Sequence, residues 1–273
     1  MASPPTPTPP VPPLAPPEKR LMAGAGLLIV LVLLVAVVLN TGASDAPQAQ
    51  TTSTTAPTVG RSRKSAAPPP RRPATPPPGT VTNPSDFDVL VDRQRSLPEG
   101  YQPADLVEVP VAFTFNGDSP KRLLRRTAAD ALTALFAAAE DAGLPLRAVS
   151  GFRSESSQRD LHDAYVAEDG EAEADRYSAS PGHSEHQTGL AMDVTGFDGA
   201  CPAEACFASR PEAAWLADHA HEFGFVVRYP AGAETLTGYS YEPWHLRYVG
   251  VDLAGELHRD GMTLDEWYGT AQR

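Results

Sequence analysis

The pattern of apolar and polar positions divides the chain into an N-terminal part without a globular pattern and a C-terminal part of short alternating elements. Residues 21–39 form an uninterrupted apolar run without a charged residue. A helix of this length would span about 28 Å, close to the hydrocarbon thickness of a bilayer. Lys19 and Arg20 precede the run, and only Asp45 is charged in the twenty residues after it. The positive-inside rule therefore predicts a transmembrane anchor with a cytoplasmic N-terminus.

A cleaved signal peptide is the alternative for this run, because residues 41–43 offer a weak cleavage site. The run is longer than the apolar core of about 7–15 residues that signal peptides usually have. We therefore expect an uncleaved anchor, with the long C-terminal part on the extracytoplasmic side of the cell membrane.

Polar, Pro-rich segments flank the predicted anchor. Most of the 29 prolines lie before residue 85, and residues 40–85 add Thr, Ser and a basic cluster at 61–72. Such a composition cannot bury a core, so we expect a disordered cytoplasmic tail at 1–20 and a disordered linker at 40–85. The basic cluster could contact an anionic surface, although a solvated linker is the simpler expectation.

Residues 86–273 carry the patterns of a folded domain. An apolar stripe from Leu123 to Phe136 predicts a helix over 120–142, with Ser119 as its cap and Gly143 as its end. Residues 90–106 contain two prolines among scattered apolar positions and should be irregular. The further predicted helices span 154–168, 211–223, 251–259 and 263–268, and the predicted strands span 146–151, 190–194, 225–229 and 244–248.

The order of these elements predicts the fold class. Helices cluster early and short strands come late, without regular β-α alternation, which favours an α+β fold with a small antiparallel sheet flanked by helices. The domain's about 190 residues are enough for one core. Its net charge of −17 argues against nucleic-acid binding, since surfaces that bind nucleic acid are basic.

The two cysteines, Cys201 and Cys206, are five positions apart. A zinc site built on this pair would need two more ligands nearby, and none is evident. In an exported protein a short-loop disulfide is the better prediction.

Candidate metal ligands occur in two separated segments. The stretch 180–193 contains His186 and Asp193, and the stretch 241–248 contains Glu242 and His245. Two imidazoles and one carboxylate are a ligand set typical of catalytic zinc, and an additional glutamate can serve as the general base of metal-assisted hydrolysis. His183 is an alternative ligand close to His186.

The spacing of Glu242 and His245 constrains the local backbone. Residues three apart in a regular strand face opposite sides of the sheet, so both could not approach one metal ion. Pro243 favours an extended or turned Glu242, and we therefore expect Glu242 on a loop that enters a strand beginning near Trp244.

Together these residues resemble a known family. Ser184-x-His186-x-x-Gly189-x-Ala191-x-Asp193, followed by Glu242-x-Trp244-His245, is similar to the bacterial VanY-type zinc D,D-carboxypeptidases of the hedgehog/D,D-peptidase superfamily. Segments 97–107 and 150–158 resemble earlier blocks of the same family, so the resemblance covers about residues 88–260.

The resemblance implies a role for each matching residue. His186, Asp193 and His245 would bind one Zn²⁺, Glu242 would be the catalytic base, and Arg153 would stabilise the oxyanion or the substrate carboxylate. For Ser184 and Gln158, a hydrogen bond with the substrate and a loop-capping role are equal alternatives.

The same resemblance implies an activity on the cell wall. The expected reaction is removal of the terminal D-alanine from peptidoglycan stem peptides, with no protein partner. An L,D-carboxypeptidase or a peptidoglycan endopeptidase on the same site is the alternative, and a non-hydrolytic wall-binding module is a second one.

Overall fold

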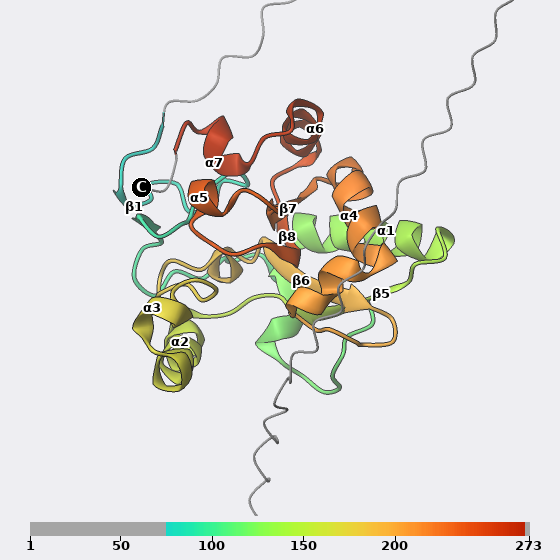
Figure 1. The fold of residues 1–273 in the computed structure, drawn as a ribbon, viewed down its shortest axis with the longest axis horizontal. Coiled ribbons are helices and arrows are strands. Elements are labelled where there is room, and N and C mark those ends of the chain that lie inside the picture. The colour runs from blue at the N-terminus through green and yellow to red at the C-terminus, as the bar shows by residue number, and fades with distance from the viewer. Residues whose placement is uncertain (1–74, 271–273) are drawn as a thin grey trace, which may run out of the picture. The chain divides into compact units, whose positions relative to one another are not determined.

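The computed structural model describes residues 75–270, and Figure 1 shows how their elements are arranged. The expected tail and anchor, and most of the expected linker, lie outside this range. Among residues 75–270, no helix is both long enough and apolar enough to cross a bilayer.

A four-stranded antiparallel sheet with the order β5-β6-β8-β7 is the centre of the fold, which confirms the predicted α+β class with a small antiparallel sheet. Two two-stranded ladders, β1-β2 and β3-β4, lie outside this sheet. The strands are β1 (Gly79–Thr80), β2 (Arg95–Ser96), β3 (Leu106–Glu108), β4 (Leu123–Arg125), β5 (Leu146–Ser150), β6 (Ala191–Gly196), β7 (Phe225–Tyr229) and β8 (Glu242–Tyr248).

Helices surround the sheet, with α2 and α3 at the lower left of Figure 1 and α4 and α6 at the upper right. The α-helices are α1 (Arg126–Asp141), α2 (Glu155–Asp169), α3 (Glu171–Ala174), α4 (Pro211–His219), α5 (Glu234–Thr237), α6 (Val251–Asp260) and α7 (Leu264–Trp267). Short 3-10 helices are η1 (Pro120–Arg122), η2 (Glu185–Thr188), η3 (Ala205–Ser209) and η4 (Ala220–Phe223).

The start of the first long helix differs from the prediction. Ser119 caps only η1, where its side chain accepts from the Lys121 amide. After η1, the residues Leu123–Arg125 are extended as β4 and pair antiparallel with β3. The helix α1 therefore begins only at Arg126. Backbone pairing with a distant segment has here outweighed the local helical pattern.

The ordered domain also begins earlier than expected. Residues 79–80, which we assigned to the linker, form β1 and pair with β2. The Cys201–Cys206 disulfide is present, as predicted, and closes a short loop after β6.

Side chains alternate between two environments along β6 and β8. Met192, Val194 and Leu246 are fully buried in the core, together with Leu132 and Leu135 of α1. The residues between them point to the opposite side, because side chains of a strand alternate between its two faces. On that opposite side, Asp193 pairs with His245 across the strands.

Candidate metal centre

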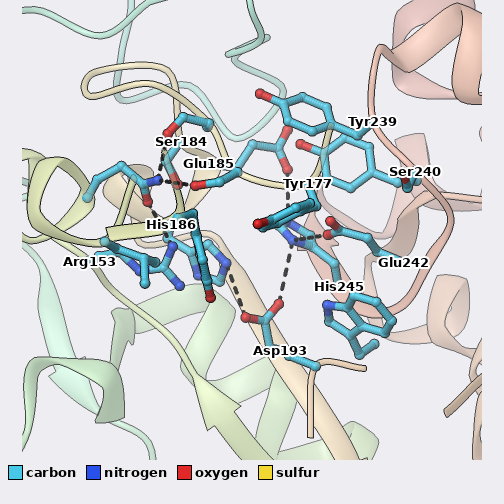
Figure 2. Close-up of a pocket in the computed structure, with 18 of the residues that line it drawn as sticks. Arg153, Tyr177, Ser184, Glu185, His186, Asp193, Tyr239, Ser240, Glu242 and His245 are labelled. Atoms are coloured by element: carbon cyan, nitrogen blue, oxygen red, sulfur yellow. Dashed lines mark hydrogen bonds and ion pairs between the residues drawn. The ribbon is translucent and has the colours of Figure 1, made fainter. Parts of the chain in front are cut away.

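His186, Asp193 and His245 meet in one cavity although they come from three elements. His186 lies on η2, Asp193 on β6 and His245 on β8. One ligand atom from each lies within 4.8 Å of the other two, and all three side chains are buried. Figure 2 shows both imidazoles directed toward the Asp193 carboxylate.

Each imidazole nitrogen lies close to a different oxygen of the Asp193 carboxylate. His186 Nε2 lies 3.3 Å from Asp193 Oδ2, and His245 Nδ1 lies 3.5 Å from Asp193 Oδ1. Ligand atoms bound tetrahedrally at 2.0–2.1 Å would be about 3.3 Å apart. Asp193 Oδ1 is buried without a hydrogen-bond partner in the described part of the chain. The donor set, its spacing and this unpaired oxygen therefore all suit Zn²⁺.

The two imidazoles present different nitrogens to this point. His186 Nδ1 lies 2.8 Å from the Gly151 carbonyl oxygen, which can only accept, so Nδ1 carries a proton and Nε2 is free to bind. In His245 the order is reversed, since Nδ1 faces Asp193 and Nε2 faces Glu185. Such partners of a ligand histidine select its tautomer and its ring orientation.

Gly151 and Gly189 allow η2 and its neighbours to pack this closely. A Cβ on Gly151 would lie 2.6 Å from the Leu123 carbonyl oxygen. Gly189 ends η2 at a φ of 66°, and a Cβ there would lie 2.7 Å from a Leu106 methyl carbon. A side chain at position 189 would displace the end of η2, and one at position 151 would displace the residue whose carbonyl oxygen contacts His186 Nδ1.

Glu242 is the first residue of β8, so our expectation that it lies on a loop before the strand was wrong. The contact with His245 comes from a register shift, in which Val227 pairs with Leu246 but Tyr229 pairs with Glu242. Two extra residues on β8 break the alternation at this bulge. Glu242 Oε2 consequently lies 3.4 Å from His245 Nδ1.

Burial and neighbouring charges have opposing effects on the pKa values of His245 and Asp193. Burial raises the pKa of the Glu242 carboxyl. Burial alone would lower the pKa of His245, but the carboxylates of Glu185 and Glu242 outweigh it and raise that pKa to about 9. Burial would likewise raise the pKa of Asp193, but the two imidazoles and Arg153 hold it below its ordinary value.

Arg153 lines the same cavity and is held by two neighbours. Its Nη1 donates to Gln158 Oε1 at 2.8 Å, and its Nη2 donates to Ser150 Oγ at 3.2 Å. The Gln158 amide in turn donates to the Ala179 carbonyl at 2.6 Å. Gln158 is thus engaged within the protein, which makes it a support for Arg153 rather than a free hydrogen-bonding group.

Ser184 also lines the cavity, beside Glu185 and His186. Its hydroxyl does not cap η2. Ser184 is thus part of the cavity wall, and its contact with a substrate stays a prediction.

The cavity has a volume of about 370 Å³, and much of its wall is aromatic. Its lining includes Tyr177, Tyr229, Tyr239, Tyr241 and Trp244. The tyrosines come from separate loops and strands, and no spacing in the sequence indicates that they would converge.

The other histidines do not join the metal centre. His183, the alternative ligand, has its Nδ1 2.6 Å from the Asp92 carbonyl oxygen. His162 is buried and lies 3.7 Å from Asp175. His221 and His258 stack on each other with ring centres 3.7 Å apart.

Glu185 lies next to the candidate metal ligands, and no sequence motif indicates it. Its carboxylate is completely buried and forms ion pairs with Arg228 and Arg247. These two arginines lie 43 and 62 positions further along the chain. The sequence shows only an acidic residue between two motif positions in a strongly acidic domain.

Comparison with known proteins places this geometry in a family. The VanY family model, described as D-alanyl-D-alanine carboxypeptidase, matches residues 121–251. The putative carboxypeptidase YodJ of Bacillus subtilis is 43% identical over 189 residues, which cover 69% of each chain.

Two solved structures are similar over most of the described part. The LdcB LD-carboxypeptidase is 42% identical with a TM-score of 0.67, over 70% of this chain and 90% of that one. A mutant of the vancomycin resistance D,D-pentapeptidase VanY in complex with Zn(II) is 30% identical with a TM-score of 0.55, over 66% and 98%. The motif residues, the sheet and these similarities agree, and the chain belongs to the VanY-type D-alanyl-D-alanine carboxypeptidase family of hedgehog-like zinc enzymes and is a hydrolytic peptidase.

Proposed function

We propose that this protein removes the C-terminal D-alanine from peptidoglycan stem peptides, with one Zn²⁺ held by His186, Asp193 and His245. The observation that carries this proposal is the convergence of these three side chains, with Glu242 3.4 Å from His245 in the same cavity. Zinc bound by such a set supplies a Lewis acid for peptide hydrolysis.

Glu242 is the general base of the proposed reaction. It takes a proton from the water that attacks the carbonyl carbon before the terminal D-alanine. When the C–N bond breaks, it returns that proton to the leaving amine. Burial raises the pKa of Glu242 toward the working pH, which suits a group that must both accept and release a proton.

Arg153 stabilises negative charge in the proposed reaction. Its side chain lines the cavity, and Gln158 and Ser150 fix the guanidinium there. A fixed cation is effective where an oxyanion develops or where a substrate carboxylate binds. Ser184 is the proposed hydrogen-bonding group for the peptide.

The residue before the scissile bond distinguishes two candidate activities. The sequence motifs favour D,D-carboxypeptidase activity, which cleaves between two D-alanines. The second candidate is L,D-carboxypeptidase activity, and the higher identity with LdcB than with VanY favours it. Both activities release a terminal D-alanine.

Purified full-length protein should be incubated with a stem tetrapeptide and a stem pentapeptide, with products followed by mass spectrometry. Loss of one alanine from either peptide supports the proposal, and the preferred peptide identifies the activity. Cleavage only within cross-linked peptides, or no zinc-dependent release of alanine, would contradict it.

The proposed cellular location is the outer side of the cytoplasmic membrane. An apolar run at 21–39 that follows Lys19 and Arg20 supports an anchor with residues 75–270 outside, where peptidoglycan is found. Protease added to intact spheroplasts should degrade residues 75–270, and full protection of this part would contradict the proposed orientation.

A further inference from the structure

Glu185 lies behind the metal centre, on the side of His245 that faces away from Asp193. Its Oε2 is 3.4 Å from His245 Nε2, longer than the 2.7–2.9 Å of an ideal charged hydrogen bond. Both atoms are buried, and neither has a hydrogen-bond partner of normal geometry in residues 75–270. Buried polar atoms of this kind are rarely left unpaired, and here each is the available partner of the other.

The two arginines leave this oxygen free for the imidazole. Arg228 Nε lies 2.8 Å from Glu185 Oε1, and Arg247 Nη1 lies 2.6 Å from the same atom. Both cations therefore bind Oε1, and Oε2 remains directed to His245. A carboxylate needed only to neutralise the arginines could have used both of its oxygens for them.

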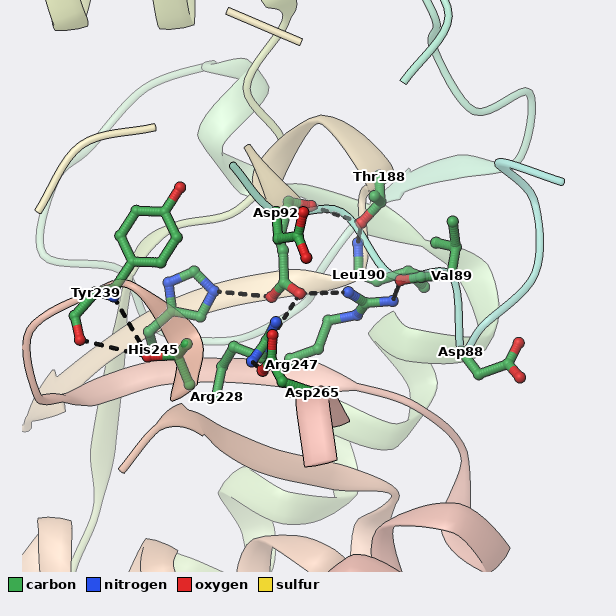
Figure 3. Close-up of polar contacts among 12 residues, drawn as sticks. Asp88, Val89, Asp92, Thr188, Leu190, Arg228, Tyr239, His245, Arg247 and Asp265 are labelled. Carbon is green, nitrogen blue, oxygen red and sulfur yellow. Dashed lines mark hydrogen bonds and ion pairs between the residues drawn. The ribbon is translucent and has the colours of Figure 1, made fainter. Parts of the chain in front are cut away.

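Each arginine also binds a group other than Glu185, as Figure 3 shows. Arg228 Nη1 lies 2.5 Å from Asp265 Oδ2 in α7, and Arg247 Nη2 donates to the carbonyls of Phe87 and Val89 at 2.9 and 2.8 Å. Each arginine is thus anchored by a second segment of the chain, α7 for Arg228 and residues 87–89 for Arg247.

The charges of this network balance without the histidine. Glu185 and Asp265 carry two negative charges, and Arg228 and Arg247 carry two positive ones. The network can therefore accept a neutral His245, which is the form that a metal requires.

We propose that Glu185 is a positioning residue for the metal centre: it accepts the Nε2–H of His245 and so leaves Nδ1 unprotonated to bind the metal. This inference rests on the proposed function, because it needs His245 as a ligand. Glutamine at position 185 could turn an N–H toward Nε2 and favour the opposite tautomer, with the proton on Nδ1.

The test is the zinc dissociation constant of the full-length protein, measured by competition with a chromophoric chelator. We expect Glu185→Gln to weaken zinc binding about 10- to 100-fold, the range found for partners of ligand histidines. Asp265→Asn is the matched control, because it alters an ion pair of the same Arg228 but does not touch His245. It should lower the thermal midpoint while leaving the zinc dissociation constant within about 2-fold of wild type, since the metal's own surroundings are unchanged.

Glu185→Asp keeps the charge that the arginines need and shortens the reach to His245, so it serves if the glutamine variant does not fold. Zinc-loaded protein with ¹⁵N-labelled histidine adds a direct readout. The wild type should show a slowly exchanging proton on Nε2 of His245, and this signal should shift or disappear in either Glu185 variant.

Unchanged zinc affinity and an unchanged His245 signal in a folded Glu185 variant would overturn the inference, as would an equal loss of affinity in Asp265→Asn. Failure of the wild type to bind zinc would instead contradict the proposed function itself. The two failures are therefore distinguishable.

Discussion

On the β6–β8 strand pair, Met192 and Leu246 face the apolar core, whereas Asp193 and His245, one position along each strand, face the metal cavity. The core side is stabilised by contacts among many buried apolar side chains. On the cavity side each buried polar group depends on a few particular partners, such as Gly151 for His186 and Glu185 for His245.

This difference teaches which property each face controls. Removing atoms from the core face costs transfer and cavity free energy, but it leaves the cavity groups in place. Changing a group on the cavity face alters charge, protonation or metal binding. We therefore expect stability and activity to separate between the two faces, and four experiments can test that separation.

The largest expected effect is on catalysis. Glu242→Gln keeps the shape of the side chain but removes the base, so kcat should fall by about 10²- to 10⁴-fold. Zinc content and the unfolding midpoint should match the wild type. Near-normal turnover, measured as D-alanine release, would show that Glu242 is not the base and that the cavity face does not act as described.

The core face should show the opposite behaviour. Leu246 follows His245 directly in β8. The substitution Leu246→Ala should lower the free energy of unfolding by about 2–5 kcal/mol because it leaves a cavity in the core. At fixed zinc concentration, urea denaturation gives this value. The folded variant should keep kcat within a few fold of wild type, and a collapse of activity at full folding would show that the two faces are coupled.

Protonation of His245 should stabilise the metal-free protein. Its pKa of about 9 exceeds the ordinary 6.5, so its contribution is complete below pH 6.5 and is lost as pH rises through 9. The shift corresponds to about 3 kcal/mol. Urea denaturation of chelator-treated protein from pH 6 to 10 should show this decline, and His245→Gln should remove it.

The smallest effect is expected in the loop after β6 that carries the disulfide. The Cys201–Cys206 disulfide closes a loop of six residues, and chain-entropy arguments give such a crosslink about 2 kcal/mol or less. Cys201→Ser with Cys206→Ser should lower the midpoint slightly and spare kcat. A stability loss larger than that of Leu246→Ala would contradict this ranking.

The sequence was informative where a signal is local. His186, Asp193, Glu242 and His245 occupy recognisable positions in two short motifs, and the structure brings them into one cavity. Gly143 and Gly224 end the helical segments before them, both with positive φ, as turn chemistry predicts.

What the sequence missed depends on distant partners. Residues 123–125 have a helical pattern but pair with β3. Glu242 lies next to His245 because of a bulge in β8, and no residue type in the sequence indicates that bulge. Glu185 is an unremarkable acidic residue until Arg228 and Arg247 are seen against it.

The most direct test of the account is native mass spectrometry of the full-length protein after zinc addition and buffer exchange. We predict one zinc ion per wild-type chain and none in Asp193→Ala at the same concentration, since the aspartate bridges the two imidazoles. A wild type that retains no zinc, or a variant that retains as much as the wild type, would contradict the metal centre on which the proposed function rests.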